Sequence, residues 1–474
     1  MASEIRVNKI ENRSGLGTVT FADTGVDLAG IVTATTFSGS GASLTALPAA
    51  QLSGALPAIS AASLTNVPAA NVVGVHTSLT VTNATTTGSA VVGGGVTISE
   101  SGIEASGIGI TCANINGTQI GGRRNIWING AMNIAQRGTS STSTGYQTVD
   151  RWVVNNSAGT ITKAQISLSN SDTGPWESGI RHALRLTNTS AIGSGSGDYA
   201  EAYYRPEAQD LAGSGWDYRN ANSFITLSYW ARASVAQAYP ATIKMGDWDY
   251  FFPWNFTIAQ ANVWQKFVIK IPGNSSMTIN NDTGIGFTLW INPYQGSNYF
   301  SGSYTANAWN AESGSSMFAG SPTTTWGTTA GATWDITGFQ LEVGSQATPF
   351  EHRSYTEELR LCQRYFQFIG SGFCAAARGG SSSVYIYSYT CPVNLRSNPT
   401  ISTSDAIAHG TFSVRRYRDD TGVSDSTSSP TTNSSLFQLN NNTIRLQQGG
   451  FSAVDDRAAI IYISGGAITL SSEL

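Results

Sequence analysis

The stretch FITLSYWA, residues 224–231, alternates apolar and polar side chains in the two-residue period of a β-strand. Three further stretches have the same character: WQKFVIKI at 264–271, GIGFTLWI at 284–291 and WDITGFQLEV at 334–343. Residues typical of turns, mainly Gly, Asn and Ser, separate them. Many short strands with almost no helical periodicity predict an antiparallel β-sandwich, of the jelly-roll kind, over residues 122–352.

The chain before this region has a different composition. Residues 28–99 contain no Asp, Glu, Lys or Arg, and SLTALPAAQLSG at 43–54 returns as SLTNVPAANVVG at 63–74. Repeats of this kind are typical of units that cannot bury an apolar face alone. We therefore expect residues 41–121 to form a thin repetitive β-shaft that packs against copies of itself. The alternative is a low-complexity linker.

Short strands are predicted within the second half of this shaft. The stretches GVTI at 95–98, GI at 102–103 and GIGIT at 107–111 place apolar residues at alternate positions, with glycines between them. Glycine permits the tight turns that such closely spaced strands require.

The two ends of the chain complete the predicted organisation. Residues 1–40 carry several early charges and one short strand at 18–21, and we expect them to be an attachment segment. Residues 353–474 begin with a connector helix at 356–366, for which Ser354 is the predicted cap and Glu357 the capping-box partner. A small β domain is expected to follow. The whole is an elongated, all-β molecule.

Composition excludes several classes of partner. The chain has a net charge of −4 and only 12% charged residues, so we expect neither nucleic acid nor an anionic membrane as a partner. No uninterrupted apolar run is long enough for membrane insertion. The stretch MASEIRV at 1–7 lacks the apolar region of a secretory signal, which predicts synthesis in the cytoplasm.

The cysteines and histidines do not form a recognisable metal site. Cys112, Cys362, Cys374 and Cys391 fit no zinc spacing and are expected to be free thiols. The four histidines are scattered: His76, His182, His352 and His409. We therefore expect no metal and no cofactor.

Several motifs resemble those of bacteriophage tail fibre proteins. NIWINGAMNIAQRG at 125–138 and YQTVDRW at 146–152 resemble the opening of the globular domain in that family, and QLEVGSQATPFE at 340–351 resembles its far end, continuing into ELRLCQRY at 358–365. Residues 1–40 and the repeat at 43–54 and 63–74 are similar to fibres of cyanobacterial and other marine phages. PVNLRSNPT at 392–400 is similar to a sequence motif that recurs in fibre tips.

The predicted sandwich at 122–352 also resembles jelly-roll carbohydrate-binding modules, in the strands around 229–232 and 264–272. Together the resemblances imply a homotrimeric fibre in the tail of a virion, made in the host cytoplasm. Its N-terminus would bind tail or baseplate proteins. Its C-terminal part would recognise a host receptor during adsorption, with cell-surface polysaccharide or lipopolysaccharide as the expected partner.

Three other functions stay open at this point: a structural or decorating fibre, a fibre that depolymerises glycans, and a non-viral adhesin. Hydrolysis of a glycan needs two carboxylates, and Asp247 and Asp249 around Trp248 are the one pair in an aromatic setting. The chain has no nucleophile elbow and no phosphate-binding loop. We therefore expect a binding protein and not an enzyme.

Aromatic side chains beside Pro, Gly and Asn are the candidates for sugar binding, because a flat ring can stack on the apolar face of a pyranose. The candidates are Trp248, Tyr250, Trp254, Tyr299, Tyr304 and Trp309. The alternative is that these rings fill the core. Core packing is the expectation for Trp230, Trp264 and Trp290, which lie within alternating strands, and a structural role is expected for Trp127 and Trp152.

A second candidate surface lies in the last region. Arg415, Arg416 and Arg418, with Asp419 and Asp420, form its charge cluster and are the predicted tip contact. The Ser-, Thr- and Asn-rich stretch 424–442 is expected to be an exposed loop that contributes to this surface.

Overall fold

The protein is described here by a computed structural model. The structure describes residues 9–11, 18–23, 25–28, 31–33, 35–36, 90–92, 96–99, 102–105, 114–115, 118–119, 123–300, 302–312, 314, 316–370, 373–381, 384–401, 411–418, 422–428, 434–438, 443–448, 458–465 and 467–474. The chain forms two compact units, 1–107 and 108–474, and each is described by itself.

The described residues of the first unit form two small antiparallel sheets. One is formed by β1 (Lys9–Glu11), β2 (Thr18–Ala22) and β3 (Gly25–Leu28). The other is formed by β4 (Ala90–Val92), β5 (Val96–Ser99) and β6 (Gly102–Ala105). The strands predicted at 18–21, 95–98 and 102–103 are confirmed. The repeats at 43–54 and 63–74, and the stretch 107–111, lie outside the described residues.

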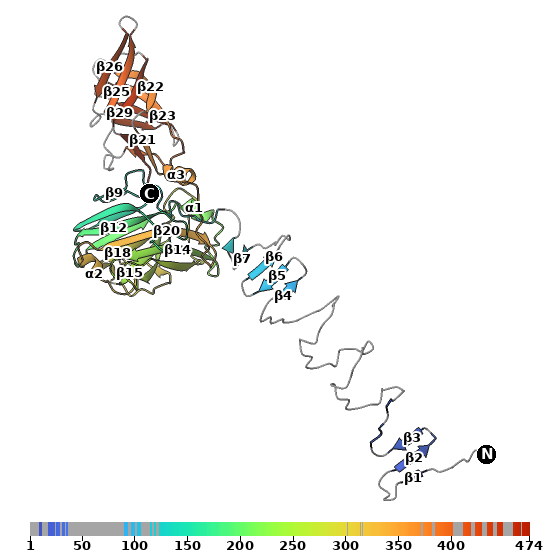
Figure 1. The fold of residues 1–474 in the computed structure, drawn as a ribbon. Coiled ribbons are helices and arrows are strands. Elements are labelled where there is room, and N and C mark those ends of the chain that lie inside the picture. Colours follow the sequence, from blue (N-terminus) through green and yellow to red (C-terminus); the bar gives the residue numbers. More distant parts are fainter. Residues whose placement is uncertain are drawn as a thin grey trace. The chain divides into compact units, whose positions relative to one another are not determined.

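The second unit begins with a hairpin of β7 (Asn114–Ile115) and β8 (Thr118–Gln119) and continues into a sandwich of two six-stranded antiparallel sheets (Figure 1). The first sheet has the order β10 (Val153–Asn156), β13 (Tyr199–Tyr204), β18 (Phe287–Gln295), β15 (Ala238–Met245), β16 (Tyr250–Thr257), β19 (Asn310–Ala311). The second has the order β17 (Gln265–Pro272), β14 (Phe224–Ala233), β20 (Thr333–Val343), β12 (His182–Ser190), β11 (Thr160–Ser167), β9 (Ser140–Ser141).

This arrangement confirms the predicted fold class. The four stretches singled out in the sequence form β14, β17, β18 and β20, and every strand pair in both sheets is antiparallel. Short helical segments lie in the connections: α1 (Ala208–Ala212), the 3-10 turn η4 (Ser297–Phe300) and α2 (Thr325–Thr328).

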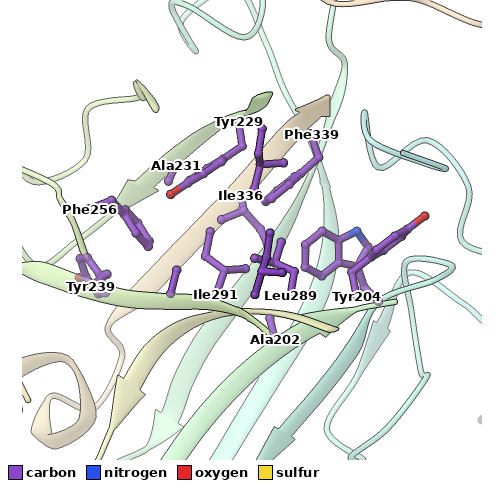
Figure 2. Close-up of a cluster of buried hydrophobic side chains, with 14 of the residues drawn as sticks. Ala202, Tyr204, Tyr229, Ala231, Tyr239, Phe256, Leu289, Ile291, Ile336 and Phe339 are labelled. Atoms are coloured by element: carbon purple, nitrogen blue, oxygen red, sulfur yellow. The ribbon is translucent and has the colours of Figure 1, made fainter. Parts of the chain in front are cut away.

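The main core lies between the two sheets. Figure 2 shows Ala202 and Tyr204 from β13 and Leu289 and Ile291 from β18 among side chains of β14 and β20. Aromatic rings fill much of this space, and Trp127 stacks on Tyr204 with ring centroids 3.9 Å apart. Both Trp127 and Trp152 are fully buried, as their predicted structural role requires.

The outer side of the second sheet is covered by residues 168–181. Trp264 is buried there in a second hydrophobic cluster, and Trp230 is half-buried against it, so both pack in a core outside the sheet and not between the two sheets. Gly174, at φ +97°, allows this approach, because a Cβ there would lie 2.5 Å from the Trp230 ring. Arg232 of the sheet pairs with Asp172 of this covering segment, at 2.8 Å, and so holds the segment against the sheet.

The C-terminal part follows the helix α3 (Tyr355–Gln363). The Ser354 hydroxyl accepts a hydrogen bond from the Glu357 N–H at 3.2 Å, which confirms the predicted cap. A three-stranded sheet has the order β21 (Phe366–Gly370), β30 (Ala467–Ser471), β24 (Thr400–Ile401). A seven-stranded sheet has the order β26 (Gly422–Ser428), β25 (Thr411–Arg418), β29 (Ala458–Gly465), β22 (Cys374–Ser381), β23 (Val384–Thr390), β28 (Thr443–Gln448), β27 (Ser434–Gln438).

The prediction of a loop at 424–442 is therefore wrong for 424–428 and 434–438, which form strands. Residues 424–428 belong to β26, which pairs with β25, and residues 434–438 form β27, which pairs with β28. Ser and Thr are abundant in turns, but their backbones pair as well as others once neighbouring strands are present.

Buried ion pairs join the C-terminal part to the sandwich. Glu207, which precedes α1, accepts hydrogen bonds from Arg364 and from the Tyr365 hydroxyl. Arg151 and Arg137 both pair with Glu473, close to the end of the described chain. These contacts connect the sandwich with both the first and the last strand region of the C-terminal part.

Candidate functional site

One face of the first sheet is turned away from the core, and we call it the outer face. On β13 the burial alternates strictly: Ala200, Ala202 and Tyr204 enter the core, whereas Tyr199, Glu201 and Tyr203 are partly exposed on the other side. On β18, Trp290 is the one side chain that is not fully buried. On β10, Asn155 lies opposite Glu201. The outer face is defined by Asn155, Tyr199, Glu201, Tyr203 and Trp290.

Two aromatic rings lie side by side on this face. Tyr203 and Trp290 are direct cross-strand partners, and their ring centroids are 6.2 Å apart with the planes tilted by 49°. Since each ring is anchored on a strand in the middle of a sheet, the pair is held in place before any ligand arrives. Such pre-organised aromatic surface costs little side-chain entropy on binding.

Polar groups flank the pair. The Asn155 side-chain amide donates to the Glu201 carboxylate at 3.2 Å, and burial raises the pKa of Glu201. The Arg205 guanidinium lies 4.7 Å from the centroid of the Tyr203 ring and donates to the Thr288 hydroxyl at 3.2 Å. The face therefore combines flat apolar rings with a carboxylate, an amide and a guanidinium. This is the composition of a site for a polar ligand with apolar faces.

One of the predicted aromatic residues, Tyr299, borders the outer face, and another, Tyr304, lies against β16. Tyr299 meets Tyr199 edge to face, with centroids 6.0 Å apart, and its hydroxyl donates to the Gly197 carbonyl at 3.4 Å. Tyr304 meets Phe251 of β16 edge to face at 4.7 Å. Residues 302–312 and 316–324 pack over the β16 side of the sheet, so Phe251 is fully buried although it points away from the core.

Three other predicted residues gather at the edge of the sandwich, in what we call the edge cluster: Trp248, Tyr250 and Trp309. The Trp248 and Tyr250 rings stack with centroids 4.0 Å apart, and Trp309 meets Trp248 at 5.3 Å. The Trp309 indole N–H donates to the Pro272 carbonyl at 2.8 Å. These rings pack against one another, and Trp248 and Trp309 also pack against the core. Little flat ring surface is therefore left to stack on a ligand.

Trp254 does not belong to either surface. Its side chain is 1% exposed, and its indole N–H donates to the Tyr229 hydroxyl within the core, at 3.2 Å. A ring in this position cannot stack on a sugar, so its prediction as a binding residue is corrected. Trp290 is the converse case, because it was expected in the core and lies on the outer face.

The predicted tip contact lies on a strand. Arg415, Arg416 and Arg418 belong to β25, which pairs with β26 and β29 in the seven-stranded sheet. Their side chains, and residues 419 and 420, lie outside what the structure describes. Their role as a contact stays a prediction.

Among the described residues, no three or more His, Cys, Asp or Glu side chains lie together in a way that could hold a metal ion. Asp247 and Asp249 lie in the turn between β15 and β16. Asp247 accepts two hydrogen bonds from Asn280, at 2.8 and 2.7 Å. Among the described helices, none has the length and apolar character to cross a membrane.

Comparisons with known proteins find similarity in structure only. No family model and no curated protein matches the chain. A proposed sugar-binding protein of Bacteroides thetaiotaomicron matches 46% of this chain and 99% of its own, at 14% identity and a TM-score of 0.27. The family 11 carbohydrate-binding module of a Clostridium thermocellum cellulosomal cellulase matches 45% of this chain and 98% of its own, at 10% identity and a TM-score of 0.22.

The enzymatically active domain of tailspike protein 4 from bacteriophage CBA120 is a further match. It covers 46% of this chain and 21% of that one, at 10% identity and a TM-score of 0.24. At these identities and TM-scores the likeness carries no argument about a ligand or an activity. We therefore argue function from the chain's own residues.

Sequence reasoning missed the central residues of the outer face: Asn155, Glu201, Tyr203 and, as a surface residue, Trp290. A signal was present in YAEAYY at 199–204, where small alanines alternate with larger side chains. Small residues on the inner side of a strand leave the large ones facing outward. That pattern is the reverse of the usual one, in which the large apolar side chains face the core.

Proposed function

We propose that the sandwich binds a glycan on the outer face, and that the chain is a phage tail fibre that recognises a host receptor through it. The observation that carries the proposal is the pair of partly exposed rings, Tyr203 and Trp290, fixed on adjacent strands beside Glu201, Asn155 and Arg205. Rings of this kind cover the C–H face of a pyranose, while the flanking groups satisfy its hydroxyls.

A shallow site of this kind is weak by itself. A Kd near 1 mM corresponds to only about 4 kcal/mol of binding free energy. Several copies held together raise the effective affinity by roughly 10²–10⁴ when their spacing allows simultaneous contact. This is why the proposal includes a homotrimer, several of which surround a tail.

The motifs at 125–138 and 340–351 support the assignment to a virion tail. In the proposed fibre, residues 1–40 bind tail or baseplate proteins, and the host partner is cell-surface polysaccharide or lipopolysaccharide. We propose that the glycan is bound and not cleaved. Asp247 is engaged by Asn280, which supports a structural use of that carboxylate.

The test compares binding of the full chain and its variants to host cells and to polysaccharide isolated from them. We expect Trp290→Ala and Tyr203→Ala to lower the affinity at least about tenfold, because each removes one stacking surface. Tyr355→Ala is the matched control, since Tyr355 is a 62% exposed aromatic residue on α3. It should bind as the unchanged protein does.

Undiminished binding by a folded Trp290→Ala, Tyr203→Ala double variant would overturn the outer face as the site. Absence of any binding by the unchanged protein would favour a structural fibre. Release of reducing sugars from the polysaccharide would show that the fibre depolymerises glycans.

A further inference from the structure

A cavity of about 390 Å³ lies within the second unit, where three segments meet. One wall is the extended segment 123–128, another is the C-terminal end of α1, and the third is formed by Arg353 and by α3. It is separate from the outer face and shares none of its residues. Three guanidinium groups line it, those of Arg123, Arg124 and Arg353, against one carboxylate, that of Asp210.

Arg353 is fixed by the fold. Its side chain is 7% exposed, donates to the carbonyls of Trp127, at 2.9 Å, and of Asn125, and pairs with the Glu358 carboxylate at 3.5 Å. Its Nε is buried and has no hydrogen-bond partner among the described residues. A buried donor without a partner is energetically costly.

Arg124 is available to a ligand. Its backbone N–H donates to the Glu351 carboxylate at 2.8 Å, whereas no hydrogen bond of its guanidinium to a described residue is found. Arg123 stands at the rim, 63% exposed, and pairs with Glu357. A neighbouring hollow shares Arg123 and Leu361 with the cavity and adds Arg360 and Glu357.

We propose that this cavity binds an oxyanion, the carboxylate or sulfate group of an acidic saccharide. Guanidinium groups present planar, forked donors that match the two oxygens of a carboxylate or sulfate. Apolar side chains of Ile126, Val343 and Leu361 line the same cavity and provide surface for a sugar ring. The chain is acidic overall, so three guanidinium groups around one cavity are a local feature and not a general excess of positive charge.

Asp210 opposes the binding of an anion and makes it depend on pH. Burial, and then the neighbouring Glu207 carboxylate, raise the pKa of Asp210 to about 6, while Arg364 and Arg151 act to lower it. Arg123, Arg124 and Arg353 line the same cavity as Asp210. Protonation of Asp210 removes the one negative charge of the lining, so affinity for an anion rises as the pH falls through about 6.

The experiment measures binding of trigalacturonate to the full chain by calorimetry, with maltotriose as the neutral probe and sulfate as the free oxyanion. We expect Arg124→Gln to weaken trigalacturonate binding about tenfold and Asp210→Asn to strengthen it and abolish its pH dependence. Arg219→Gln is the matched control, because Arg219 is exposed and donates only to the Ser275 carbonyl in the described contacts.

Tighter binding of trigalacturonate than of sulfate supports a saccharide ligand, whereas equal binding of the two overturns that part of the proposal. Equal binding of maltotriose, or a folded Arg124→Gln variant with unchanged affinity, overturns the site itself. Trp290→Ala should leave this binding unchanged. Failure of the outer face as a glycan site can therefore be distinguished from failure of the cavity.

Discussion

Glu207 accepts hydrogen bonds from Arg364 through both carboxylate oxygens, at 2.6 and 2.8 Å, although 157 residues separate the two in the chain. The Glu207 side chain is fully buried, and the Tyr365 hydroxyl donates to it at 2.6 Å. Burial acts to raise the pKa of Glu207, but the hydrogen bonds from Arg364 and Tyr365 outweigh it and leave the pKa below its usual value. The pair therefore ties the C-terminal part to the sandwich as an ionised contact.

We expect Glu207→Ala to lower the free energy of unfolding by about 3 kcal/mol, because it leaves the Arg364 charge without its partner in a largely buried place. Denaturant unfolding followed by tryptophan fluorescence, which reports on the sandwich, measures this. Glu312→Ala is the matched control. It breaks the Lys244–Glu312 pair, which is partly exposed, and should cost less than about 1 kcal/mol. Equal effects of the two substitutions would contradict the role assigned to Glu207.

Trp254 and Trp309 should respond differently to truncation. Trp254→Ala opens a cavity in the core and removes the partner of the Tyr229 hydroxyl, which costs about 3–5 kcal/mol. Trp309 is only partly buried at the sandwich edge, so Trp309→Ala should cost less. Thermal unfolding of both variants measures the difference. A Trp254→Ala variant as stable as the unchanged protein would show that this ring is not a core residue.

The strands were predictable because their side chains alternate, and α3 because Ser354 and Glu357 mark its first turn. The role of Trp254 was not predictable. In β16 the residues from Phe251 to Trp254 are all buried, since the core covers one side and residues 302–312 and 316–324 cover the other. Alternation in the sequence is lost where both sides of a strand are covered, and only the tertiary fold decides which residues remain exposed.

The outer face was hidden for a related reason. Tyr203 and Tyr204 are adjacent and chemically identical, yet one is on the outer face and the other is buried against Trp127. The alternation in the sequence indicates that neighbouring residues lie on opposite sides of the strand. The packing of the two sheets determines which of those sides faces the core. Arg124 and Arg353 are likewise 229 positions apart, and only the fold brings them to one cavity.

Asp210 should make stability depend on pH. A carboxyl whose pKa is raised on folding, here from 3.8 to about 6, stabilises the fold below its unfolded pKa, and this contribution is lost as the pH rises through about 6. Asp210→Asn carries no charge at any pH. We expect it to match the unchanged protein near pH 4 and to be more stable near pH 8 by about 1 kcal/mol, a value reduced for solvent screening.

Urea unfolding at the two pH values measures this difference, and Asp217→Asn, at an exposed position nearby in the chain, is the control. A gain in stability that is equal at both pH values would show that the charge of Asp210 is not its cause.

The first unit exposes apolar side chains that a single chain leaves in water. Ile10 on β1 is 52% exposed, Val26 and Leu28 on β3 are 53% and 46% exposed, and Ile31 after β3 is 97% exposed. Burial of such surface is worth roughly 25 cal/mol per Å². Packing three chains together would bury these side chains, as it would bury the apolar stripes predicted for the shaft.

We therefore expect sedimentation equilibrium of the full chain to yield the mass of three chains. Val26→Asp with Ile31→Asp should weaken this assembly, because charges would enter the contact, and Leu47→Asp with Val67→Asp should do the same in the predicted shaft. Thr33→Asp, at an exposed polar position beside the apolar group, is the control and should remain trimeric. A stable monomer of the unchanged chain at micromolar concentration would contradict the trimer, and with it the gain in avidity on which the proposed adsorption depends.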